Sequence, residues 1–240
     1  MKKMLLLLTV LLMLSSNAFS EEMKQDKKEP IGKKMPTRFQ AVSPDKAVIL
    51  QEGENKMYCP KCAMTLPMFY KTNHAAHIDG KPEQYCSIHC LAETMADGGK
   101  VSSIKVVDNS TLKFIDVIKA WYVVGSVKAG TMSMTSKYAF GKKTDAEKFA
   151  KEFGGKIMTF SAILDSVKST LAEETAMVKK KQAMMAQKGE MMYANICTPI
   201  DAEFKSIADA KTYVAAKKPC GELKGKQLQA ISIYLNSRNK

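Results

Sequence analysis

The sequence predicts an α+β protein in which two ββαβ-like repeats are followed by an all-α tail. Between His74 and Phe160, segments typical of strands and helices occur twice in the order strand, strand, helix, strand. From Ser161 onward the pattern is helical only. We therefore expect a sheet-containing metal-binding domain over residues 57–162, a connecting helix over 163–188 and a helical tail over 189–240.

The elements of the two repeats can be placed from periodicity and turn residues. The first repeat is expected to have strands around 75–78 and 83–86, a helix near 88–96 and a strand at 102–107. The second is expected to have strands near 111–115, 118–124 and 137–140, a helix at 145–153 and a strand at 156–160. The second helix is marked best, because Thr144 and Glu147 form a capping box and Gly154 supplies a left-handed stop.

The segment after the second repeat carries helical signals. An amphipathic stripe runs from Ile163 to Leu171, and no Gly or Pro follows until after Lys188. Further helices are expected at 207–216 and 225–235. Four methionines of this region are most simply core-facing helix residues: Met184, Met185, Met191 and Met192.

The N-terminus resembles an export signal. Two lysines, an apolar run over residues 4–14 and the closing Ala18-Phe19-Ser20 predict a cleavable signal peptide at residues 1–20. The run is shorter than the roughly 20 residues that span a bilayer, so no stable membrane insertion is expected. Residues 21–56 are poor in apolar side chains at their start and predict a flexible leader.

The chain is basic, with a formal charge of +13. Its lysines are spread along the sequence and are not interleaved with aromatic residues. Because the chain is expected to be exported, nucleic acid is the weakest partner class. The charge is then either a solvated face or a surface that docks an acidic protein or an anionic membrane face.

The strongest chemical signal is a C-x2-C-x23-C-x3-C pattern formed by Cys59, Cys62, Cys86 and Cys90. Two cysteines from a turn and two from a helix start can converge on one soft or borderline metal ion. A helix N-terminus beside Cys86 would favour its thiolate. The alternatives are a pair of disulfides, which export permits, and a structural Zn(II) site.

Methionines near these cysteines favour copper. Met64 lies two residues after Cys62, and Met132 and Met134 lie in a Gly-flanked loop. Thioethers are soft donors that prefer Cu(I), although in a loop they can equally fill space. The candidate metal ligands are therefore Cys59, Cys62, Met64, Cys86, Cys90, Met132 and Met134.

The three histidines are weaker candidates. His89 is more simply a surface or capping residue than a ligand, although its place between two cysteines keeps the ligand interpretation open. His74 and His77 are three residues apart in a predicted strand, so their side chains should face opposite sides of the sheet. A joint site of these two histidines is not expected.

At this point the motifs resemble a known family. Residues 58–64, Tyr-Cys-Pro-Lys-Cys-Ala-Met, resemble the CPxCGM signature of nitrous-oxide-reductase accessory proteins of the NosL type. Further similar stretches follow in the family's order at 114–116 with 120–126, at 130–132 and at 146–156. The resemblance covers roughly residues 57–162.

The resemblance implies a periplasmic metallochaperone and not an enzyme. Such a protein would bind Cu(I) and supply it to a copper-accepting partner, nitrous oxide reductase or its maturation machinery, on a two-repeat α+β fold. Cys59, Cys62, Met64 and Met132 would be its leading ligands. The chain departs from the family in lacking a lipobox, in Ala63 for Gly and in Thr131 for Pro. The extra pair at 86 and 90 resembles zinc-binding treble-clef motifs of the TRASH type.

The tail resembles a small monohaem cytochrome c over 189–197 and 223–235. A C-x-x-C-H haem motif would fall on 197–201, where the second cysteine and the histidine are absent, so haem is not expected. In this likeness Cys197 and Cys220 form a structural disulfide.

Two other functions compete with copper delivery. One is a thiol-disulfide oxidoreductase using Cys59 and Cys62, but Pro67 and its neighbours break the helix that usually follows such a motif. The other is a structural Zn(II) module for protein interaction. Organomercurial cleavage would rest on analogy of fold alone.

Overall fold

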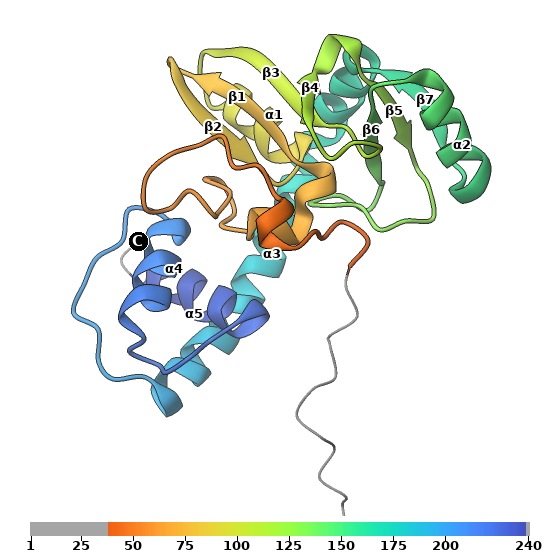
Figure 1. The fold of residues 1–240 in the computed structure, drawn as a ribbon. Coiled ribbons are helices and arrows are strands. Elements are labelled where there is room, and N and C mark those ends of the chain that lie inside the picture. Colours follow the sequence, from red (N-terminus) through yellow and green to blue (C-terminus); the bar gives the residue numbers. More distant parts are fainter. Residues whose placement is uncertain (1–37, 239–240) are drawn as a thin grey trace, which may run out of the picture. The chain divides into compact units, whose positions relative to one another are not determined.

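A computed structural model describes residues 38–238 of the 240-residue chain. The predicted signal peptide, residues 1–20, and residues 21–37 of the predicted leader lie outside the described residues. The described part combines helices with two β-sheets, in agreement with the α+β class (Figure 1). None of the helices described in this range is both long and apolar enough to cross a bilayer.

The first sheet has four antiparallel strands in the order β2-β1-β3-β4. Its strands are β1 (His74–Ile78), β2 (Lys81–Tyr85), β3 (Val101–Val107) and β4 (Phe114–Asp116), and helix α1 (Ile88–Ala96) lies between β2 and β3 in the chain. The central strand β1 is buried along most of its length. Short 3-10 helices occur at η1 (Pro44–Lys46), η2 (Leu66–Thr72) and η3 (Val117–Lys119).

The second sheet has three antiparallel strands in the order β6-β5-β7. They are β5 (Trp121–Val124), β6 (Lys137–Phe140) and β7 (Lys156–Thr159), with helix α2 (Lys143–Phe153) between β6 and β7. Ala146 and Phe149 of α2 pack on this sheet, as the predicted apolar face requires. The core between the sheets includes Tyr122 and residues of α1 and α3.

Helix α2 begins differently from the prediction. Its first residue is Lys143 and its N-cap is Lys142, which makes no side-chain capping bond. Thr144 therefore lies inside the first turn, so the predicted capping box with Glu147 is wrong. Gly154 ends the helix with φ +74°, as expected of a residue without a Cβ.

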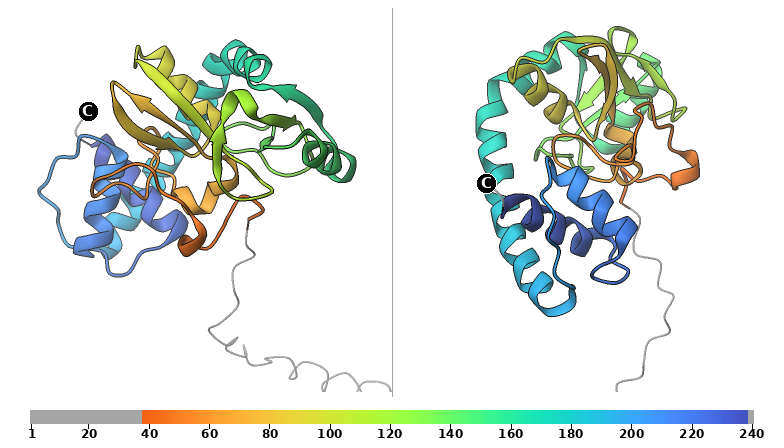
Figure 2. Two further views of the ribbon diagram at one scale, coloured as in Figure 1. Left: turned by 45° about the horizontal axis from the view of Figure 1, so that its top comes forward. Right: turned by 90° about the vertical axis from the view of Figure 1, so that its left-hand side faces the viewer.

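A single helix, α3 (Phe160–Ile196), crosses the boundary that the sequence placed at residue 188. Its first turns bury Ile163 and Val167 in the core between the sheets. Its second half packs against α5 (Gly225–Ser237), and α5 in turn packs against α4 (Ile207–Lys217) (Figure 2). Gly189 lies inside the helix, and a Cβ there would lie 2.1 Å from the Ala230 carbonyl oxygen of α5. This glycine serves close helix packing.

The methionines of α3 correct another expectation. Met184 and Met191 are 49% and 61% exposed, so they do not face the core. Met185 and Met192 are half-buried. The second half of α3 has packing partners on one side only, and an apolar residue type does not determine which side it occupies.

Parts of residues 38–56, which the sequence assigned to a flexible leader, contact the two sheets. The Phe39 ring lies 5.2 Å from the Tyr138 ring and 5.9 Å from the Phe149 ring. The Leu50 amide donates to Gln84 Oε1 at 2.9 Å. These are long-range contacts, which the composition of the segment does not indicate.

Candidate metal centre

Four cysteine sulfurs meet in the core of the first sheet unit. The Sγ atoms of Cys59, Cys62, Cys86 and Cys90 all lie within 4.8 Å of one another, and all four residues are buried and free of disulfides. Cys62 and Cys86 are 3.4 Å apart, and Cys90 is 3.7 Å from each of them. The predicted convergence of the two cysteine pairs is therefore observed.

The first pair is presented by a tight turn. Tyr58 and Thr65 form an antiparallel bridge, and the Cys59 amide donates to the Met64 carbonyl at 2.9 Å. The Ala63 amide donates to the Cys59 carbonyl at 2.8 Å, and Ala63 has φ +55°. The turn thus needs a left-handed residue where the family signature has Gly.

The second pair is presented by a strand end and a helix start. Cys86 directly follows β2, Ser87 is the N-cap of α1, and Cys90 lies in the first turn. Ser87 has an extended backbone conformation, and α1 begins at the next residue. The sulfurs of Cys86 and Cys90, four residues apart, thereby lie within 3.7 Å of each other. The Thr72 hydroxyl donates to the Cys86 carbonyl at 2.8 Å and holds this junction.

The four thiols differ in acidity. Burial acts to raise the pKa of Cys59, but hydrogen bonds from the other three thiols outweigh it and hold that pKa well below its usual range. Burial raises the pKa of Cys86, and hydrogen bonding to Cys59 raises that of Cys90. The metal-free cluster therefore favours one thiolate stabilised by neighbouring thiols, and metal binding would release the remaining protons.

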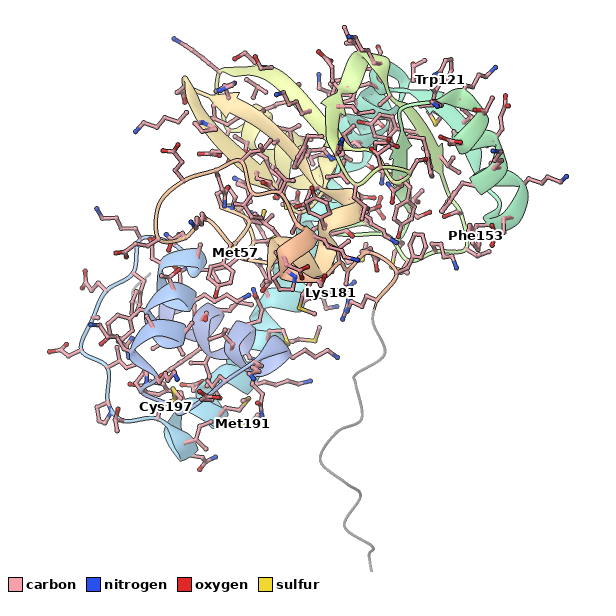
Figure 3. The ribbon with its side chains drawn as sticks, viewed as in Figure 1. Met57, Trp121, Phe153, Lys181, Met191 and Cys197 are labelled. Carbon is pink, nitrogen blue, oxygen red and sulfur yellow. A yellow bond between two sulfur atoms is a disulfide. The ribbon has the colours of Figure 1, made fainter. Side chains whose placement is uncertain are left out.

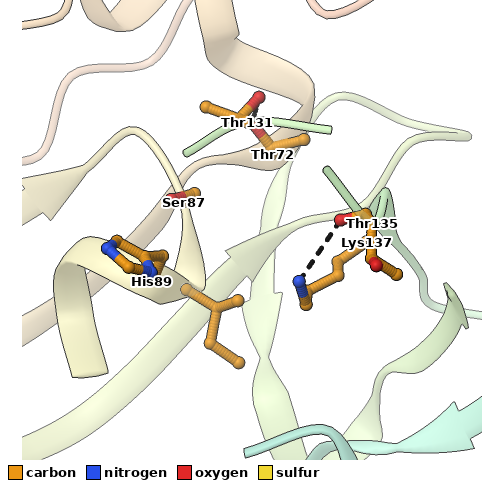
Figure 4. Close-up of a pocket in the computed structure, with 7 residues that line it drawn as sticks. Thr72, Ser87, His89, Thr131, Thr135 and Lys137 are labelled. Atoms are coloured by element: carbon orange, nitrogen blue, oxygen red, sulfur yellow. Dashed lines mark hydrogen bonds between the residues drawn. The ribbon is translucent and has the colours of Figure 1, made fainter. Parts of the chain in front are cut away.

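Two of the three candidate methionines pack against the core cluster that contains the cysteines. Met64 and Met132 are half-buried and pack against the same core cluster. The Met132 loop is tied to the site because Thr131 Oγ1 lies 2.9 Å from Thr72 Oγ1, the hydroxyl that holds Cys86 (Figure 4). Met134 is 78% exposed and is not part of this cluster.

His89 is not the surface residue that the sequence suggested. It is 1% exposed, and its Nδ1 lies 3.2 Å from Glu174 of α3 and its Nε2 3.6 Å from Glu93. The ring lines a small pocket together with Thr135 and Lys137 (Figure 4). The sequence could not reveal this, since Glu174 lies 85 residues away.

The other two histidines behave as predicted. His74 is buried, donates from Nδ1 to the Thr72 carbonyl at 3.1 Å and accepts from the Tyr122 hydroxyl at Nε2 over 3.0 Å. His77 is exposed on the other side of β1. They form no joint site.

Two site residues that the sequence analysis missed come from the tail. Lys211 of α4 is 3% exposed and donates to the Ala63 carbonyl at 2.7 Å. Gln229 of α5 donates to the Cys62 carbonyl at 2.9 Å. Figure 3 shows Met57, at the start of this turn, beside α4. Lys211 lies 148 residues from Ala63 in the sequence. No sequence signal distinguishes this lysine from the many others of the chain.

The tail contains the predicted disulfide. Cys197, which follows α3, is bonded to Cys220, which follows α4. This confirms the pairing inferred from the cytochrome-like segments. The bond closes a helical unit whose core is formed by residues of α4 and α5.

Comparisons with known proteins support the family resemblance over the sheet region. Residues 51–168, just under half of the chain, match the protein-family model NosL. The match ends before the second half of α3 and the helices α4 and α5. A similar solved structure is that of the copper chaperone NosL from Shewanella denitrificans, which is 24% identical and has a TM-score of 0.38. That alignment covers 53% of this chain and 96% of the other. No curated protein matches the chain.

Proposed function

We propose that this protein binds Cu(I) through its cysteine cluster and passes the ion to a copper-accepting protein. The observation that carries the proposal is the group of four buried, free thiols within 4.8 Å. Two methionines, Met64 and Met132, pack against the core cluster that contains these thiols. The NosL match over 51–168 supports the same function. By that resemblance the acceptor is nitrous oxide reductase or its maturation machinery.

The sulfur positions fit a metal ion. Four sulfurs about 2.3 Å from one tetrahedral ion are separated by about 3.8 Å. The separations of 3.4 and 3.7 Å between Cys62, Cys86 and Cys90 need only a small outward movement to reach this value. Three of the thiolates, or two with a thioether, would equally suit the low coordination of Cu(I).

Delivery requires exchange of sulfur ligands with the acceptor. Because the four cysteines are buried, we propose that the copper ion leaves the cluster past the half-buried residues Met64 and Met132. A thioether is a weaker ligand than a thiolate, so it can hand the ion on. The basic charge of the chain would help an acidic acceptor to dock.

A structural Zn(II) centre is the second candidate, and a specific observation favours it. The four cysteines are between 0% and 3% exposed, and a turn followed by a helix start is a common frame for closed zinc sites. A thiol-disulfide enzyme is favoured less. Its attacking thiolate must be accessible, whereas Cys59 is 0% exposed.

Anaerobic titration of the reduced protein with Cu(I) against a chelator tests the proposal. We expect tight Cu(I) binding, a loss of at least about 100-fold in affinity for Cys59→Ser and Cys86→Ser, and about tenfold for Met132→Ala. Met134→Ala is the matched control, because its thioether lies outside the cluster, and its affinity should be unchanged. Bound zinc that excess Cu(I) does not displace would instead establish the structural centre.

We further propose that the two sheets are repeats of one ββαβ unit and that the chain is exported to the periplasm. The matching order of a strand pair, a helix and a strand supports the first statement. The signal-like residues 1–20 support the second. Secretion can be tested by sequencing the N-terminus of the periplasmic form, which should begin after Ser20; a mature chain that retains residues 1–20 contradicts it.

A further inference from the structure

The helical tail reaches the metal centre through one buried cation. The Lys211 ammonium is within hydrogen-bonding distance of three acceptors, the Ala63 carbonyl at 2.7 Å, Thr65 Oγ1 at 3.2 Å and Gln229 Oε1 at 2.7 Å. It also lies 4.6 Å from the centre of the Tyr58 ring. All three donors of the side chain are thus directed at the turn or at its neighbour in α5.

Gln229 continues this connection to a cysteine. Its carbonyl oxygen accepts from Lys211 while its amide donates to the Cys62 carbonyl. A further link joins the side chains of Asn55 and Asp209. The tail therefore holds the backbone carbonyls of Cys62, the last residue of the CPKC sequence, and of Ala63, the residue after it.

The charge of Lys211 has no carboxylate partner within the described residues 38–238. A buried cation without a counter-charge is costly. Burial lowers the pKa of Lys211 to about 8, and the thiolates of Cys62 and Cys59 act in the opposite direction. The available negative charge near this ammonium is that of the cysteine cluster.

We propose that Lys211 and Gln229 are positioning residues of the metal centre, so that the C-terminal helices form part of the metal-binding structure. A metal ion with three or four thiolates carries net negative charge, whether the ion is Cu(I) or Zn(II). A fixed ammonium beside the turn stabilises that charge, and the two hydrogen bonds fix the turn. Metal retention and docking of the tail are then thermodynamically coupled.

This inference rests on the proposed metal binding but not on the identity of the metal. It is tested on the full-length, metal-loaded protein by measuring the rate at which an excess of chelator removes the ion. We expect Lys211→Met to release the metal about 10–100-fold faster than the native chain. Lys211→Arg keeps the charge and should restore most of the retention. Lys217→Met, an exposed lysine of the same helix, should change nothing.

Two further measurements separate positioning from simple folding. Gln229→Met removes the hydrogen bond to Cys62 without changing charge, and it should accelerate release by less than Lys211→Met does. In the native protein, loading with metal should slow hydrogen exchange of amides in α4 and α5, and Lys211→Met should abolish this slowing. If Lys211 only supports packing of the tail, Gln229→Met should release metal at the native rate, and metal should not slow hydrogen exchange in α4 and α5.

The outcomes distinguish this inference from the proposed function. If the native protein binds Cu(I) or Zn(II) but Lys211→Met and Lys217→Met release it equally fast, the positioning role is refuted and the metal site stands. If the native protein retains neither metal, both proposals fail. If Lys211→Met does not fold, equal release by Gln229→Met and the native chain refutes the role.

Discussion

The two sheet units share an order of elements but fill their interiors in opposite ways. We call residues 57–107 the cysteine unit and residues 121–159 the aromatic unit. In each, a central strand pairs on one side with its hairpin partner and on the other with the strand after the helix. The interior of the first contains four thiols together with apolar residues such as Leu66 and Leu91, whereas that of the second consists mainly of packed rings.

The difference indicates which unit depends on a ligand. In the aromatic unit, the ring centres of Tyr138 and Phe140 lie 5.5 and 5.1 Å from that of Phe149, so the core is complete without any ion. In the cysteine unit, the buried thiols hydrogen bond only weakly to one another. We infer that the aromatic unit supplies stability independent of metal, and that the cysteine unit becomes fully stable when metal is bound.

The largest expected effect comes from emptying the aromatic core. Phe149→Ala should lower the free energy of unfolding by about 3–5 kcal/mol, because it leaves a cavity between four other rings. Urea denaturation of the metal-free protein measures this change. The folded variant should still bind metal with native stoichiometry. A loss of metal binding by the folded variant would show that the two units are not independent.

The interface between the two units should show a smaller, pH-dependent effect. His74 of β1 is stacked on Tyr122 of β5, with ring centres 5.9 Å apart, and burial lowers the pKa of His74 to about 4. An unfolded histidine titrates near 6.5. Between pH 6.5 and 4 the unfolded chain therefore binds a proton that the folded chain does not. Stability present above pH 6.5 is lost progressively as the pH falls to about 4, by about 3 kcal/mol in total.

Urea denaturation of the metal-free protein at pH 7 and pH 5 measures this loss. His74→Gln retains groups that can pair with Thr72 and Tyr122 but cannot titrate, so its stability should fall less over the same interval. The difference between the two proteins isolates His74 from the carboxylates, which both share. His77→Gln is the matched control, because His77 is exposed on the same strand. Parallel pH curves for the native chain and His74→Gln would contradict the prediction.

Local patterns predicted much of the fold because they report local structure. Helix α1 begins and ends where the periodicity placed it, and α4 begins at the expected Ile207. The opposite faces of His74 and His77 follow from the period of a strand. The predicted boundary of a helix was wrong where a distant contact explains the residue. Gly189 is a sequence signal for a helix end, but it lies inside α3, where the missing Cβ allows α5 to pack closely.

At the candidate site, the convergence of the four cysteines was predictable from the sequence and the surroundings of the cysteines were not. Cysteine spacing restricts where four thiols can meet, so their convergence could be inferred. Met132 and Met134 are two residues apart in one loop, and only the fold separates the thioether beside the cluster from the exposed one. Lys211 and Gln229 reach the turn across more than a hundred residues, a placement that no local pattern encodes.

The smallest expected effect concerns backbone strain, compared at one position of each unit. The aromatic unit has Gly154 at φ +74° and ψ −175°, a region almost restricted to glycine, whereas the cysteine unit has Ala63 at φ +55°. Ala63→Gly should relieve the strain of a left-handed Cβ, partly offset by greater freedom of the unfolded chain. The expected gain in unfolding free energy is about 0.5–1 kcal/mol. Chemical denaturation of the metal-free protein measures it.

Gly154→Ala is the counterpart and should have the opposite sign. No atom lies within 4 Å of a Cβ added at Gly154, so the expected cost of about 1–3 kcal/mol comes from the backbone conformation alone. Neither substitution removes a metal ligand or the Ala63 carbonyl that Lys211 holds. Native metal affinity in both variants is therefore expected. If Ala63→Gly destabilised the metal-free chain, residue 63 would carry no left-handed strain in the absence of metal. The left-handed turn would then depend on bound metal.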